Sequence, residues 1–88
     1  MKIIKRDGRA VDYDRSRIAM AIEKATKEEV NEIIEYIEEL GKKRMLVEDV
    51  QDIIEQKLMD FKRFELAKKY MIYRYTRALV RKQNTTDE

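Results

Sequence analysis

The sequence contains no cysteine and no histidine, and these absences exclude several kinds of chemistry. Without cysteine the chain forms no disulfide and has no thiol nucleophile, and without either residue the usual zinc sites are missing. No apolar run approaches the ~20 residues that span a bilayer, and the opening segment MKIIKRDGR lacks the apolar region of a signal peptide. We therefore expect a cytoplasmic protein with no membrane partner.

Proline is absent as well, and only two glycines occur among the 88 residues, so long helices are permitted over most of the chain. Apolar and charged residues each account for 43%, which is typical of amphipathic helices around a thin core. The formal net charge of +2 is too small to indicate a nucleic-acid-binding protein from composition alone. These bounds favour one small domain that is mostly helical.

The local patterns predict a hairpin followed by helices. Asp7-Gly8 is a strong signal for a two-residue turn between strands at 2–6 and 9–13. The short stretch 44–46 fits a third strand beside this hairpin. Apolar residues recur at helical spacing in four other segments. They predict helices at Arg15–Thr26, 27–43, 47–60 and 61–83.

Several residues fit the ends of these helices. Asp14 is a good N-cap for the first helix, and Gly41 fits the position just after the second. Glu28 and Glu29 are predicted to lie in the first turn of the second helix, where the helix dipole favours carboxylates. The polar stretch 84–88 reads as the start of a linker.

No catalytic constellation is present in the sequence. Composition rules out a nucleophile–histidine pair, and neither GxxxxGK[ST] nor GxGxxG occurs. The glutamates are interspersed with lysines on predicted helix faces, where the ordinary interpretation is solvated charge. We therefore predict a binding domain that is not an enzyme.

Basic residues gather around the hairpin turn and the start of the first helix. Lys5, Arg6 and Arg9 flank the turn, and Arg15 and Arg17 follow at the helix start. Cations there oppose the helix dipole, whereas an anion bound nearby would benefit from them and from the free N–H groups of the first turn. A triphosphate would match this density of charge. An ordinary solvated hairpin tip is an equally good explanation from spacing alone.

The fourth predicted helix adds a second basic position. Leu66, Tyr70, Tyr73, Arg77 and Val80 share one stripe, in which Arg77 interrupts an apolar and aromatic face. A guanidinium there needs an anion or a route to water, and the Tyr73 ring offers a flat surface for a base. The alternative is a core tyrosine beside an arginine that extends to solvent, and taken alone this stripe favours that alternative.

Both clusters fall on segments that resemble one family, the ATP-cone. IKRDGRAVDYDRSRIAMAIEKA is similar to the start of this nucleotide-sensing module of ribonucleotide reductases, and VEDVQDIIEQKLM and ELAKKYMIYRYTRALVR are similar to its second half. The resemblance covers residues 3–81. It implies a mostly helical α+β fold, a four-helix bundle capped by a small N-terminal hairpin or three-stranded mixed sheet. The domain would occupy 1–83, and the tail at 84–88 resembles the linker of anaerobic ribonucleoside-triphosphate reductases.

The resemblance also implies a ligand and a role. ATP as activator and dATP as inhibitor, with Mg²⁺, would compete for one site between cap and helices and regulate a reductase allosterically. The implied partner is the catalytic domain or subunit of that reductase, and the family also allows a homo-oligomer. By position, the nucleotide-binding residues would be Ile3, Lys5, Arg6, Val11, Asp14, Arg17, Val47, Gln51, Tyr73 and Arg77.

Two alternatives are weighed against this interpretation. The ATP-cone of a reductase-gene repressor follows a cysteine-rich zinc ribbon, and the absence of cysteine counts against it. A small helical nucleic-acid-binding module would use the basic residues of the fourth helix, namely Lys68, Lys69, Arg74, Arg77 and Arg81. The acidic helices and the nearly balanced charge argue against that module, so nucleic acid is an unlikely partner.

Overall fold

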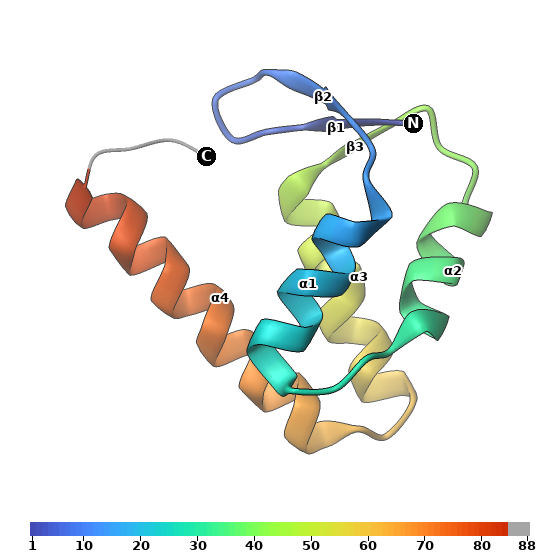
Figure 1. Cartoon of the computed structure of the whole chain (residues 1–88), viewed down its shortest axis with the longest axis vertical. Coiled ribbons are helices and arrows are strands. Elements are labelled where there is room, and N and C mark those ends of the chain that lie inside the picture. Colours follow the sequence, from blue (N-terminus) through green and yellow to red (C-terminus); the bar gives the residue numbers. More distant parts are fainter. Residues whose placement is uncertain (85–88) are drawn as a thin grey trace.

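Three short strands and four helices make up the computed structural model, which describes residues 1–84 and side chains as far as Lys82. The elements are β1 (Lys2–Ile4), β2 (Ala10–Asp12), α1 (Arg15–Thr26), α2 (Asn31–Glu39), β3 (Arg44–Leu46), α3 (Val47–Asp60) and α4 (Phe64–Asn84). The sheet lies across one end of the helices (Figure 1). The predicted mostly helical α+β class is confirmed. Residues 85–88 of the predicted linker lie outside the described part of the chain.

β1 is the central strand of a mixed sheet whose order is β2-β1-β3. It runs antiparallel to β2, with Ile3 opposite Val11, and parallel to β3, with Ile3 opposite Met45. An ion pair between Lys2 and Asp12 joins β1 and β2 on their exposed side. The sheet is attached to the bundle through Met45, which is buried in the core. The predicted three-stranded mixed sheet is therefore confirmed.

The hairpin turns through a longer loop than the two-residue turn predicted at Asp7-Gly8. The Gly8 N–H donates to the Lys5 carbonyl at 2.9 Å, and the Lys5 N–H donates to the Arg9 carbonyl at 2.8 Å. These two bonds enclose a three-residue loop at 6–8. Gly8 has a φ of +91°, the left-handed conformation that glycine adopts without strain at the end of such a loop.

The four helices form a closed ring, because α1 and α3 each pack on both α2 and α4. This arrangement confirms the predicted four-helix bundle. Its buried apolar side chains are Ile22, Val30, Ile33, Ile34, Ile37, Met45, Val50, Ile54, Leu58, Leu66, Ala67 and Tyr70. Each large one contributes about 1.5–3 kcal/mol when fully covered. Within residues 1–84 none of the helices has both the length and the apolar character needed to cross a bilayer.

Helix α2 starts at Asn31, later than predicted, because the chain turns after α1. Lys27 takes a left-handed φ of 65° and ends that helix. The buried hydroxyl of Thr26 then accepts a hydrogen bond from the Glu28 N–H at 3.2 Å, which fixes the connection. Glu28 and Glu29 consequently lie before α2, and the prediction that they occupy its first turn is wrong.

The other helix ends are closer to the prediction. The ranges of α1 and α3 are confirmed, and Asp14 caps α1 through its side chain. Gly41 follows α2 with a φ of 64°, as expected for its position. Helix α4 begins at Phe64 and not at Phe61, because Lys62 adopts a left-handed φ of 59° in the connection from α3.

Candidate functional site

A cavity of about 590 Å³ lies where the hairpin, α1, the start of α3 and the later turns of α4 meet. Helix α4 approaches α1 near its own N-terminus and diverges from it toward the hairpin side of the molecule (Figure 1). The volume falls in the range of small-molecule and cofactor sites, roughly 300–1,000 Å³. The cavity is therefore large enough to hold a small-molecule ligand.

All ten residues predicted to bind nucleotide line this one cavity. The hairpin supplies Ile3, Lys5, Arg6 and Val11, and the start of α1 supplies Asp14 and Arg17. The remaining four come from the other side of the cavity. They are Val47 and Gln51 on α3 and Tyr73 and Arg77 on α4. The fold thus brings together residues that span more than seventy positions of sequence, while their role in binding stays a prediction.

Positive charge is concentrated on the walls. The basic side chains among the described lining residues are Lys5, Arg6, Arg17, Lys24, Arg74, Arg77 and Arg81, and the acidic ones are Asp12 and Asp14. Seven cations and two carboxylates line this concave site, and carboxylates just outside the lining pair with two of the cations, Arg6 and Arg74. Such a site attracts anions, because low-dielectric walls focus the field of the charges.

The inner surface of the cavity is apolar and aromatic. Ile3, Val11 and Val47 line it together with the rings of Tyr70 and Tyr73. Tyr70 is only 2% exposed, and this burial raises the pKa of its phenol, so the ring stays neutral. A flat apolar group bound here would lie within reach of the basic side chains around it. The arrangement suits a ligand that joins an aromatic ring to an anionic group.

The charged residues at the start of α1 have different roles. Asp14 accepts hydrogen bonds from the Ser16 N–H at 3.0 Å and from the Ser16 hydroxyl at 2.6 Å, and these bonds lower its pKa. Its carboxylate is thus engaged in capping the helix. Arg17 lines the cavity, whereas Arg15 forms an ion pair with Glu38 at 3.4 Å.

The charge pattern around the turn is therefore less uniform than the sequence suggested. Arg9 was grouped with Lys5 and Arg6, but its guanidinium pairs with Asp7 at 2.6 Å, within the loop itself. Neither Arg9 nor Arg15 is among the described residues that line the cavity. Local carboxylates bind these two arginines, and only part of the basic cluster faces the site.

Arg6 makes two contacts with the first turns of α3. Its Nε donates to Glu48 Oε1 at 2.7 Å, and its Nη2 donates to Gln51 Oε1 at 3.1 Å. Two of the predicted residues, Arg6 and Gln51, are thus bonded to each other. The contacts fix the hairpin loop against α3 and hold the guanidinium at the edge of the cavity.

Arg74 is a lining residue that the sequence interpretation did not place in the site. Its guanidinium forms ion pairs with Glu48 at 2.5 Å, Asp52 at 2.8 Å and Glu55 at 2.6 Å. These carboxylates raise the pKa of Arg74, although burial opposes the change, and Arg74 in turn is the main cause that lowers the pKa of Glu48. The signal was available in the sequence, because Glu48, Asp52 and Glu55 are spaced i, i+4, i+7 and share one face of α3.

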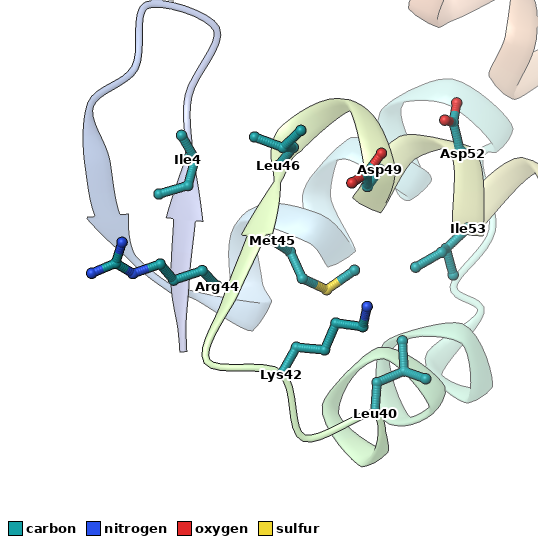
Figure 2. A pocket seen from close by; sticks show the side chains of 9 residues that line it. All are labelled: Ile4, Leu40, Lys42, Arg44, Met45, Leu46, Asp49, Asp52 and Ile53. Carbon is teal, nitrogen blue, oxygen red and sulfur yellow. The ribbon is translucent and has the colours of Figure 1, made fainter.

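A second cavity, of about 520 Å³, lies beside β3 and the start of α3. Figure 2 shows its lining, in which Met45 and Ile53 lie among Lys42, Asp49 and Asp52. The Arg44 side chain is directed away from the two aspartates. The lining of this second cavity has two basic and two acidic side chains, whose charges balance, so it lacks the concentration of positive charge found in the first.

Comparison with known proteins identifies a family model that matches residues 1–79, described as the ATP cone domain. A vitamin B12-dependent ribonucleoside-diphosphate reductase of Thermoplasma acidophilum is 34% identical over 96 positions, which cover 93% of this chain and 12% of that protein. A ribonucleoside-diphosphate reductase subunit alpha of Chlamydia muridarum is 33% identical over 109 positions, covering 100% of this chain and 10% of that protein. The chain therefore spans about a tenth of the length of these relatives.

Proposed function

The chain belongs to the ATP-cone family, and on that premise we propose that it is an allosteric ATP- and dATP-binding regulatory domain of a ribonucleotide reductase. The observation that carries this proposal is the cavity in which seven basic side chains surround an apolar and aromatic surface. A nucleoside triphosphate has the matching chemistry, because it joins a flat base to a chain of negative charges. Basic side-chain donors of this kind are usual ligands of phosphate.

In the proposed complex the phosphates lie against the cations and the base against the apolar wall. The phosphates are assigned to four cations, Lys5, Arg6, Arg17 and Arg77, and Tyr73 is assigned to contact with the adenine ring or the sugar. Among the described residues no group of three or more acidic side chains is arranged to hold a metal ion. We therefore propose that Mg²⁺ enters bound to the phosphates, since this ion is commonly held by substrate phosphates with few protein ligands.

The regulatory mechanism is a shift between two arrangements of the domain and its partner. ATP and dATP differ by one hydroxyl, so the site must translate a small difference in affinity into a different packing against a neighbour. The proposed neighbour is the catalytic domain or subunit of the parent reductase, or a second copy of the domain, in the cytoplasm. The relatives are named as diphosphate reductases. The tail led to the prediction that the parent is an anaerobic triphosphate reductase, and this stays a prediction. The predicted bounds of the nucleotide-binding domain, 1–83, also stay a prediction.

Nucleotide-dependent melting tests the proposal. We expect ATP or dATP with Mg²⁺ to raise the melting temperature, because a ligand that binds only the folded state adds RT ln(1 + [L]/Kd), about 2.7 kcal/mol at a hundredfold excess over Kd. Steady phosphate release is not expected. The absence of any shift at millimolar nucleotide in low salt would contradict the proposal, and steep salt-dependent binding of duplex DNA would favour the nucleic-acid-binding alternative.

A further inference from the structure

Among the described ion pairs, Glu48 is the one carboxylate that contacts both Arg6 and Arg74, two of the arginines that line the cavity. Its two oxygens are divided between them, with Oε1 at 2.7 Å from Arg6 Nε and Oε2 at 2.5 Å from Arg74 Nη2. Both arginines line the cavity, whereas Glu48 does not. The pair of contacts links the hairpin loop to α4 through the first turn of α3.

The two arginines depend on Glu48 to different extents. Arg74 also pairs with Asp52 and Glu55, so its charge stays balanced when Glu48 moves away. Arg6 has Glu48 as its carboxylate partner among the described ion pairs, and its other contact there is the neutral amide of Gln51. Removing Glu48 from Arg6 would therefore leave a guanidinium ready to accept another anion.

Glu48 is also placed so that it can leave at small cost. Its side chain is 49% exposed, compared with 20% for Arg6, so the carboxylate can turn to water while the guanidinium stays at the cavity. A half-exposed ion pair of this kind contributes little net stability. A triphosphate brings several negative charges to the same guanidinium and is repelled by Glu48 as long as the carboxylate stays in place.

We propose that Glu48 is an internal counter-ion that competes with the nucleotide phosphates for Arg6, an inference that rests on the proposed function. Entry of the triphosphate replaces the Glu48 carboxylate on Arg6 by a phosphate and breaks one of the two contacts through which Arg6 fixes the hairpin loop to α3. Glu48 thereby sets the affinity of the site from outside the cavity. The same exchange couples occupancy of the site to the position of the hairpin, through Arg6.

The test is the variant Glu48→Gln, compared with the wild type in ATP–Mg²⁺ titration calorimetry and in thermal melting without nucleotide. We expect affinity to rise by up to about fivefold, the fold-change that corresponds to an exposed ion pair. The melting temperature without nucleotide should fall. A merely structural role for Glu48 would lower both quantities, so opposite signs are the distinguishing result.

Glu55→Gln is the matched control, because it removes the same charge from Arg74 without touching Arg6. We expect it to leave affinity for ATP unchanged, and we expect Glu48→Gln to lose its gain when Arg6→Gln is also present. The inference would be overturned if Glu48→Gln and Glu55→Gln raised the affinity for ATP equally. It would also be overturned if Glu48→Gln left that affinity unchanged or lowered it. In either case the proposed function would stand. A wild type that binds no nucleotide would overturn both.

Discussion

The buried core beneath α2 is apolar, whereas the region around the hairpin loop is charged and contains an open cavity. Ile33, Ile37 and Leu58 are 0% exposed and belong to the apolar core. On the other side, Arg6 and Arg74 lie at the cavity with about a fifth of each side chain exposed. The comparison indicates that the fully buried core and the charged wall of the cavity lie in different parts of the same small domain.

Helix α4 belongs to both regions and shows the change within a single stripe. Leu66 and Tyr70 are buried in the core, Tyr73 is half-buried, and Arg77 and Val80 are exposed. The helical spacing that places Leu66 and Tyr70 in the core thus continues along α4 and places Tyr73 and Arg77 at the cavity. A change at the first turns of α4 should affect folding, and a change at the later turns should affect binding.

The largest expected effect lies in the apolar core. Leu58→Ala should lower the free energy of unfolding by about 2–5 kcal/mol, because it removes buried methyl groups and leaves a cavity. Denaturant unfolding followed by circular dichroism measures the change. Ile72→Ala is the control, since Ile72 is 56% exposed on α4 and its loss should cost much less. Similar losses in the two variants would erase the contrast between the two regions.

A smaller effect is expected in the charged region, and it should appear in affinity. Arg77→Ala should weaken ATP binding by about 1.5–3 kcal/mol, the usual size of a hydrogen bond to a charged group. Lys43→Ala removes the same charge at an exposed position outside the cavity and should change affinity little. Calorimetry on both folded variants decides the matter. Equal losses would show that binding depends on overall charge and not on the position of Arg77.

The smallest effect is expected where the two regions meet, at Asp14. Asp14→Asn keeps a side-chain oxygen for the helix cap and should melt close to the wild type, whereas Asp14→Ala should melt lower. Folding lowers the pKa of Asp14 from 3.8 through its bonds with Ser16, so its contribution is complete above that pKa and is lost on further acidification. Melting curves between pH 7 and pH 3 test this sign. An advantage of the wild type over Asp14→Ala that grows as the pH falls toward 3 would contradict it.

Much of the fold was predictable because local patterns and tertiary packing agree. The stripe of α1 from Ile18 to Ala25 and the stripe of α3 have single apolar faces, and their ranges were predicted correctly. The start of α2 was not, because the turn at Lys27 depends on a left-handed backbone that a lysine rarely adopts and on the hydrogen bond of a buried threonine. Sequence periodicity contains no signal for either.

The candidate site, like the fold, was predictable from the sequence only in part. The residues assigned through the family resemblance all reached one cavity, since the resemblance carries three-dimensional information that spacing lacks. The ion pairs of Arg6 and Arg74 with Glu48 were missed, because they join residues 42 and 26 positions apart along the chain, and the carboxylate spacing on α3 does not name its partner. Arg9 was grouped with the wrong partners for a local reason, its ion pair with Asp7 inside the loop.

The parallel pairing of β1 with β3 has a consequence for how the chain reaches this structure. Ile3 meets Met45 about forty residues later, after two helices have been crossed. Contacts between distant residues form slowly compared with local ones, because the intervening loop must first be closed at an entropic cost. The helical hairpins can therefore assemble early, while the central strand waits for its second neighbour. Since Ile3 of that strand lines the cavity, we expect the cavity to be complete only after this long-range pairing has formed.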